Sequence, residues 1–238
     1  NKSLGTNSSE QPVRLFFQYA LILGLFITFN VGLAGLLGKI IGTSSDVVAD
    51  QSSLASNLAF VVVSGPLLAW LLLWLKKSIA RNPLDAAGFI PTFFATLAAI
   101  ISLLVFLSSA IAVSYNLIEG APTLGNTSAR AIVWGLALIL VLRASNAVIP
   151  KNDFRIQYFV GTLITAIAAI VGLTKVLADL FSTILSQPIF LGAQAPALIS
   201  TGEKLLDGFG TLVIASALWF YYWIKNANTK TNDTMWLS

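Results

Sequence analysis

The sequence predicts an all-α integral membrane bundle of six transmembrane helices arranged as three hairpins, with both termini in the cytoplasm. Three observations support this prediction: an apolar composition, six long apolar runs and an uneven distribution of basic residues. Of the 238 residues, 56% are apolar and only 10% are charged, and the mean hydropathy is +0.83. A soluble domain carries roughly 25% charged residues. The charged side chains here are too few to cover a water-facing surface, which excludes a soluble globular protein.

The six apolar runs define the helices in order. A bilayer core about 30 Å thick requires around 20 apolar residues in a helix. The runs that meet this length cover residues 15–41, 54–75, 89–118, 131–149, 156–185 and 205–224. The fourth is the weakest, because Arg143 interrupts it. The resulting organisation is a polar tail (1–12), a transmembrane domain (13–225) with hairpins 13–77, 88–149 and 154–225, and a C-terminal tail (226–238).

The basic residues orient this bundle. One predicted side of the membrane holds both tails and the connections that follow the second and fourth helices. It carries ten Lys and Arg residues: Lys2, Arg14, Lys76, Lys77, Arg81, Arg143, Lys151, Arg155, Lys225 and Lys230. The opposite side carries three, Lys39, Arg130 and Lys204. Basic residues accumulate on the cytoplasmic side of membrane proteins. The pattern therefore predicts a multi-pass protein of the bacterial cytoplasmic membrane, with an even number of spans.

Short repeated motifs indicate that the first and third hairpins are related. Val31-Gly32-Leu33 recurs as Val171-Gly172-Leu173, and the Trp70/Trp74 pair recurs as Trp219/Trp223, each pair followed by Leu or Ile and then Lys. The alternative is convergence on the same interfacial chemistry. Gly32, Gly35 and Gly38 also form a stripe of small residues, which predicts close contact with a neighbouring helix.

The start of the first helix, VRLFFQY at 13–19, and a second helix that runs from Leu54-Ala55-Ser56 to Trp74 and ends in Lys resemble an uncharacterised bacterial membrane domain. That family is a domain of unknown function built from tandem two-helix hairpins. The resemblance extends over roughly residues 13–225. It implies the hairpin architecture, and it implies no activity, cofactor or site residue.

Three groups of side chains are candidates for a site. Trp70, Trp74, Trp219 and Trp223 form a predicted interfacial aromatic belt, with a pigment, quinone or lipid site as the alternative. Lys175 and Asp179 are four residues apart on one helix face, which predicts an ion pair near the outer interface. Arg143 is a candidate contact for a lipid phosphate or an acidic partner, unless it only extends to the cytoplasmic surface.

Other polar groups within the spans are interpreted as hydrogen bonds between helices. They are Asn30, Ser108, Ser109, Ser114, Asn116 and Thr165. The chain has no Cys and no His. We therefore expect no metal site, and no cofactor held through His or Cys, and contact with lipid or pigment stays open. Membrane lipids and other membrane subunits are the expected partners, and nucleic acid is not.

No paired catalytic carboxylate, phosphate loop or nucleotide fingerprint occurs in the sequence, so we expect no enzyme activity. The favoured function is a non-catalytic accessory or scaffold subunit of a larger membrane complex, with respiratory and photosynthetic complexes as options. Two surfaces suggest docking: the uncharged third span with Phe93, Phe94 and Phe106, and the uncharged segment 186–200. The alternative is a small-solute transporter or channel, although such proteins usually place ionisable residues near the midplane.

Overall fold

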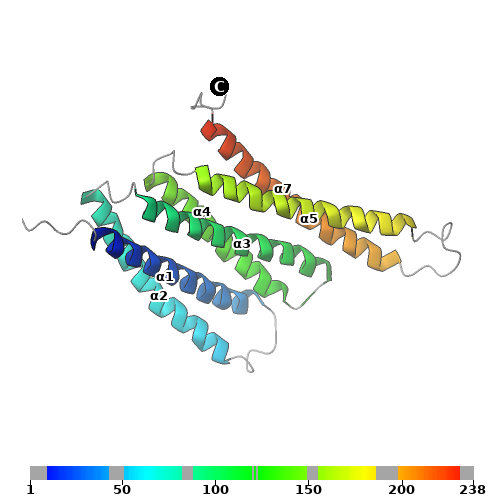
Figure 1. Ribbon diagram of the computed structural model, residues 1–238. Helices are drawn as coiled ribbons and strands as arrows, with labels where there is room; N and C mark the ends of the chain where they lie inside the picture. Colours follow the sequence, from blue (N-terminus) through cyan, green and yellow to red (C-terminus); the bar gives the residue numbers. More distant parts are fainter. Residues whose placement is uncertain are drawn as a thin grey trace, which may run out of the picture.

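The computed structural model describes residues 10–42, 51–81, 88–119, 121, 123–148, 155–185 and 198–230. The described chain is all-α, with no strand, and consists of six helices. They are α1 (Glu10–Ile41), α2 (Gln51–Arg81), α3 (Phe89–Glu119), α4 (Leu124–Val148), α5 (Arg155–Leu185) and α7 (Leu198–Lys230). Figure 1 shows these helices side by side in one bundle.

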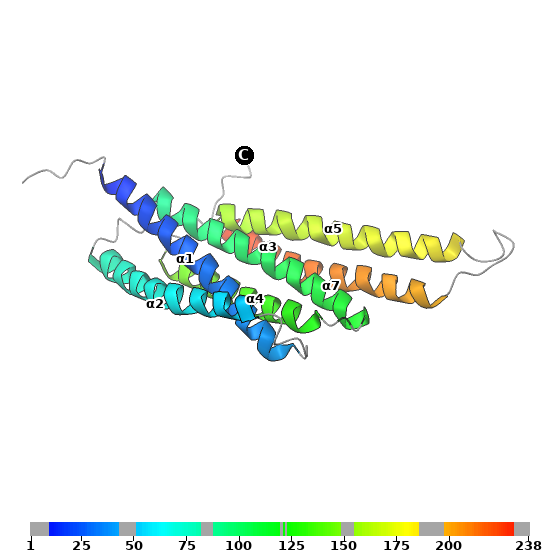
Figure 2. The same ribbon diagram turned by 90° about the horizontal axis from the view of Figure 1, so that it is seen from below.

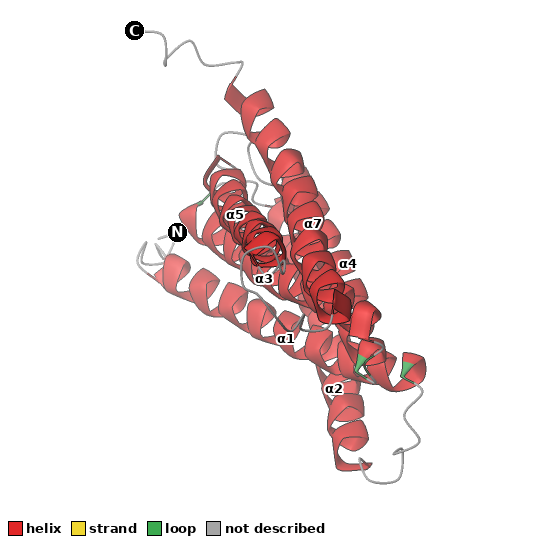
Figure 3. Ribbon diagram, turned by 90° about the vertical axis from the view of Figure 1, so that its right-hand side faces the viewer, coloured by secondary structure: helices red, strands yellow, loops and turns green. Residues whose placement is uncertain are grey.

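Consecutive helices pair as three hairpins, as the sequence predicts. The most extensive packing joins α1 with α2, α3 with α4, and α5 with α7, which we call hairpins 1, 2 and 3. Hairpin 2 lies in the middle, because α4 packs on α1 and α3 packs on α7. In Figure 3, α2 lies at one edge of the bundle, away from α5 and α7.

The hairpins are staggered along the bundle. We call the end where α1 begins and α7 ends the terminal end, and the opposite end the far end. In Figures 1 and 2, the far ends of α5 and α7 extend beyond those of the other helices. The far half of hairpin 3 is therefore covered mainly by its own two helices.

Five of the helices are long and apolar enough to cross a membrane, among the residues that the structure describes. They correspond to Val13–Ile41, Ser52–Ala80, Phe89–Leu117, Leu124–Ser145 and Gln157–Ser182. The weak fourth run is thus a full candidate span that begins before the predicted residue 131. The sixth predicted run, in α7, is not among these five.

The glycine stripe of α1 packs against two neighbours. A β-carbon added at Gly32 would lie 2.7 Å from Cβ of Phe60 on α2, and one at Gly38 would lie 3.3 Å from Cα of Asn126 on α4. Gly32 allows α1 to approach α2 within hairpin 1, and Gly38 allows α1 to approach α4 of hairpin 2. The predicted close contact is confirmed, and the stripe serves two helices rather than one.

The buried core lies between hairpins 2 and 3. It is a cluster of six buried residues, Ala99, Leu103, Leu138, Leu142, Tyr158 and Tyr222. The position of α3 in this core corrects one expectation. Phe94 is 7% exposed, and the ring of Phe106 lies against Gly135 of α4, so these two side chains pack inside the molecule. Of the three Phe residues expected to form a docking surface, only Phe93 is exposed.

The polar side chains inside the helices bond mostly within their own helix. Asn30 Nδ2 donates to the carbonyl of Phe26, and Thr165 Oγ1 donates to the carbonyl of Gly161. Asn116 Nδ2 donates to Thr127 Oγ1 at 3.1 Å, and this bond does join α3 to α4. The predicted hydrogen bonding between helices therefore holds for Asn116, whereas Asn30 and Thr165 satisfy their polar groups locally.

Candidate functional site

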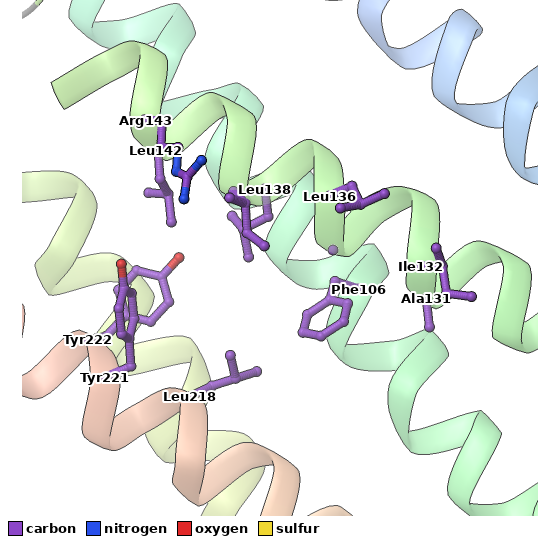
Figure 4. Close-up of a pocket in the computed structure, with 12 residues that line it drawn as sticks. Phe106, Ala131, Ile132, Leu136, Leu138, Leu142, Arg143, Leu218, Tyr221 and Tyr222 are labelled. Atoms are coloured by element: carbon purple, nitrogen blue, oxygen red, sulfur yellow. The ribbon is translucent and has the colours of Figure 1, made fainter. Parts of the chain in front are cut away.

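A groove between α4 and α7, with α3 beneath it, is the clearest candidate site. Its volume is about 630 Å³. Most of its lining is apolar, and the polar exceptions lie at one end (Figure 4). The residues that matter for its chemistry are Phe106 from α3, Leu138, Leu142 and Arg143 from α4, and Leu218, Tyr221 and Tyr222 from α7.

The polar end of the groove brings together a cation and two hydroxyl groups. In Figure 4 the hydroxyls of Tyr221 and Tyr222 point toward the end of the groove where Arg143 lies. Arg143 is exposed, and no described acidic side chain forms an ion pair with it. The ammonium group of Lys225 lies 6.0 Å from the ring centre of Tyr221, which adds a second positive charge nearby. The arrangement is suited to an anionic group.

Tyr222 is held in place by the packing of hairpin 3. Its side chain is 2% exposed, and its ring centre lies 6.3 Å from that of Tyr158 on α5. A β-carbon at Gly161 would overlap the ring, so the glycine makes room for it. Tyr222 lies between Trp219 and Trp223 in the sequence, and the sequence reasoning missed its burial. The signal was a stripe of small residues on the same face of α7, Gly208, Thr211 and Ala215.

A pair of Gln–Tyr dipeptides is a second feature that the sequence reasoning missed. Gln18-Tyr19 lies near the start of α1, and Gln157-Tyr158 lies at the start of α5. Gln157 is 2% exposed, and neither its Oε1 nor its Nε2 has a hydrogen-bond partner among the described residues. The Oε1 of Gln18 is likewise buried without one. The two pairs stand at nearly the same distance before Val31-Gly32-Leu33 and Val171-Gly172-Leu173, so a comparison of the two hairpins that allows a one-residue shift reveals the repeat.

The predicted aromatic residues lie at the terminal end and mostly face outward. Trp70, Trp74 and Trp223 are exposed, and Trp219 is half-buried with its ring centre 5.7 Å from that of Trp223. They belong to the outer helix of hairpin 1 and to α7. Their assignment to an interfacial belt stays a prediction, since the structure contains no membrane. Of the aromatic residues around them, Tyr221 and Tyr222 line the groove.

Lys175 and Asp179 both lie in the far half of α5. Lys175 is exposed and Asp179 is half-buried. The Cβ of Lys175 contacts α7, 3.2 Å from where a β-carbon at Gly208 would lie. These residues are therefore far from the groove, and their pairing stays a prediction. Among the described residues, no group of three or more acidic, His or Cys side chains is placed to hold a metal ion.

The chain matches a known protein family. A family described as a domain of unknown function, DUF5671, matches residues 15–144. This range contains almost all of hairpins 1 and 2, and is shorter than the 13–225 expected from the resemblance. It includes the α4 side of the groove and not the α7 side. No curated protein and no solved structure shows significant similarity to the chain. Since the match covers more than half of the 238 residues, the protein belongs to the DUF5671 family.

Proposed function

We propose that the chain is a six-span protein of the bacterial cytoplasmic membrane with both termini in the cytoplasm. Five helices have the required length and hydropathy, and α7 is the main packing partner of the fifth. Because α7 runs back alongside α5, we expect it to cross the same membrane layer as α5. The excess of basic residues at the terminal end supports a cytoplasmic location for that end.

The absence of native Cys makes this topology simple to test. Single Cys residues introduced as Ser78→Cys in α2 and Ser200→Cys in α7 should react with a membrane-impermeant maleimide from opposite sides. Ser78 lies near the terminal end and Ser200 near the far end. Labelling of both positions from the same side would contradict the six-span arrangement.

For the function itself, we propose a non-catalytic accessory or scaffold subunit of a larger membrane complex, without a cofactor held by His or Cys. The observation that carries this proposal is the far half of α5. After Lys175 and Asp179 this helix continues to Leu185, and it still exposes large apolar side chains. Leu180 is 42% exposed, Phe181 61% and Ile184 54%.

The length of α5 explains why these side chains need a partner. Its 31 residues span about 46 Å at 1.5 Å per residue, against a hydrocarbon core of about 30 Å. With its start near the cytoplasmic interface, the segment past Lys175 reaches the outer interface. Lipid tails no longer surround Leu180, Phe181 and Ile184 at that level. Another membrane protein that covers them would remove this apolar surface from water.

The experiment compares this surface with one at the far end of hairpin 1. The test variant is the triple substitution Leu180→Gln, Phe181→Gln and Ile184→Gln. The matched control is Ile40→Gln, because Ile40 is 80% exposed near the far end of α1 and follows Lys39. Tagged chains are extracted from native membranes in a mild detergent and separated on a native gel.

The wild type and the Ile40→Gln control should migrate with a multi-subunit assembly, and the triple variant should migrate alone. Equal migration of the triple variant and the wild type within the assembly would show that this surface is not the contact. If the wild type migrates only as a monomer or homo-oligomer, and moves a small solute across liposome membranes, the transporter alternative replaces the proposal.

A further inference from the structure

We propose that the groove between α4 and α7 binds an anionic phospholipid, with an acyl chain between the helices and the phosphate at Arg143. This inference is independent of the accessory role, since the groove lies at the opposite end of hairpin 3 from the proposed docking surface. It rests on three features of the groove: its apolar length, its charged end and the level of that end in the helices.

The apolar part of the groove suits a hydrocarbon chain. Phe106, Leu138 and Leu218 line it from three different helices. Its volume of about 630 Å³ lies within the range of roughly 300–1,000 Å³ that is typical of small-molecule sites. Leu136 and Ile139 at its margin are 57% and 48% exposed, so the groove opens sideways toward the lipid phase. A chain can enter from the bilayer without crossing water.

The charged end suits a phosphate. A guanidinium group donates two parallel hydrogen bonds to a phosphate, and such charge-assisted bonds are stronger than neutral ones. Arg143 has no described acidic partner, so an anion supplies the countercharge that the protein itself does not. The hydroxyls of Tyr221 and Tyr222 can donate to the same phosphate, and Lys225 adds positive charge on the same side.

The level of Arg143 agrees with the position of a lipid headgroup. Arg143 lies five residues before Val148, the last residue of α4, which is about 8 Å along the helix. That distance places the guanidinium between the hydrocarbon core and the aqueous surface. A free phosphate ion would occupy only this end and leave the apolar groove empty. A phospholipid has both parts in the order that the groove requires.

Lipid binding to the purified full-length chain tests the proposal. Dioleoyl phosphatidylglycerol, which is anionic, and dioleoyl phosphatidylcholine, which is zwitterionic, are titrated separately and the bound lipid is counted by native mass spectrometry. The wild type should retain one phosphatidylglycerol with about tenfold higher affinity than phosphatidylcholine. Arg143→Gln should reduce the affinity for phosphatidylglycerol to that for phosphatidylcholine.

Two further variants separate the charged end from the apolar part. Arg130→Gln is the matched control, because Arg130 is an exposed arginine at the other end of the same helix and does not line the groove. It should leave both affinities unchanged. Ala131→Phe fills the apolar part and should weaken both lipids. Far-UV circular dichroism checks that each variant is folded. If Arg143→Gln does not fold, Tyr221→Phe replaces it and should lower phosphatidylglycerol affinity about threefold.

Several results would overturn the proposal. Equal binding of the two lipids, or an equal loss in Arg130→Gln and Arg143→Gln, would mean that general charge attracts the lipid. Displacement of phosphatidylglycerol by inorganic phosphate would identify a site for a free anion. A dimer of the chain that Ala131→Phe dissociates would show that a second copy occupies the groove.

Discussion

Hairpins 1 and 3 share sequence motifs but dock on the middle hairpin in different ways. Each places a glycine, Gly32 or Gly172, where its two helices approach closely, and each starts with a Gln–Tyr pair. In hairpin 1 the ring of Tyr19 stacks on Phe94 of α3, with ring centres 6.2 Å apart. In hairpin 3 the ring of Tyr158 packs on Tyr222 of its own partner helix. The ring of Tyr19 therefore stacks directly on the middle hairpin, whereas the ring of Tyr158 packs on its own partner helix within the core that hairpins 2 and 3 share.

The close approach also differs between these hairpins. A β-carbon at Gly172 would lie 2.7 Å from the backbone nitrogen and 2.8 Å from Cα of Leu212. At Gly32 the nearest atoms are Cβ of Phe60 and the carbonyl oxygen of Asn57, at 2.7 and 2.8 Å. At Gly172 every near contact is with main chain, whereas Gly32 also meets side chains. The repeated glycine thus specifies that two helices pair, whereas their relative register depends on the residues that surround the glycine.

Replacing the repeated glycines should give the largest effects. Gly172→Ala should lower the free energy of unfolding by about 3 kcal/mol, because the backbone of α7 must move to admit the methyl group. Gly32→Ala should cost about 2 kcal/mol, because one of its three near contacts, Val61 Cγ2, belongs to a side chain that can rotate. The measurement is unfolding in mixed detergent, monitored by circular dichroism. Gly24→Ala is the control, since nothing lies within 4 Å of its added β-carbon. A larger loss in Gly32→Ala than in Gly172→Ala would reverse the comparison.

Replacing the two buried glutamines should give an intermediate effect of opposite sign. Gln157→Met should raise the free energy of unfolding by about 1 kcal/mol, because it removes a buried amide that has no partner among the described residues. Gln18→Met should raise it by about half as much, because Gln18 is only half-buried and Oε1 is its only buried atom without a partner among the described residues. The same unfolding measurement applies. Destabilisation by Gln157→Met would show that its amide binds a group beyond the described residues.

The smallest effect is expected where a glycine faces a flexible side chain. At Gly35 of hairpin 1 an added β-carbon would meet only atoms of the Asn57 side chain. That side chain can rotate away, and alanine is the better helix former by about 1 kcal/mol. Gly35→Ala should therefore change the free energy of unfolding by less than about 0.5 kcal/mol. A loss similar to that in Gly32→Ala would mean that Asn57 is fixed in position.

The helix pairs could be predicted from the sequence because the signals are local. Apolar runs of sufficient length and polar connections define each helix and its antiparallel neighbour, and Gly32 and Gly172 mark the contact within two of the pairs. The docking between hairpins depends on which face of each helix turns inward. Phe94 and Phe106 show why the inward face is difficult to predict, because an aromatic side chain is similarly stable in lipid and in a protein core. Their burial depends on partners more distant in the chain.

The groove could be predicted only in part for a similar reason. The sequence singled out Arg143 as a contact for lipid or partner, because a charge within an apolar run is costly. It did not place Arg143 opposite Tyr221 and Tyr222, which are nearly eighty residues away in the chain. Their juxtaposition follows from the packing of α7 on α3, and no periodic pattern in either helix encodes that contact.

The packing of α1 against α4 has a consequence for synthesis of the chain. Each helix has a packing partner next to it in the chain, but Gly38 of α1 and Gly42 just after α1 also contact Asn126 and Gly125, which are synthesised later. At translation rates of about 5 to 20 residues per second, the intervening residues take roughly 4 to 16 s to emerge. During that interval the glycine face of hairpin 1 is open in the membrane. An insertase or chaperone that shields small-residue helix faces would act on this chain before the fourth helix arrives.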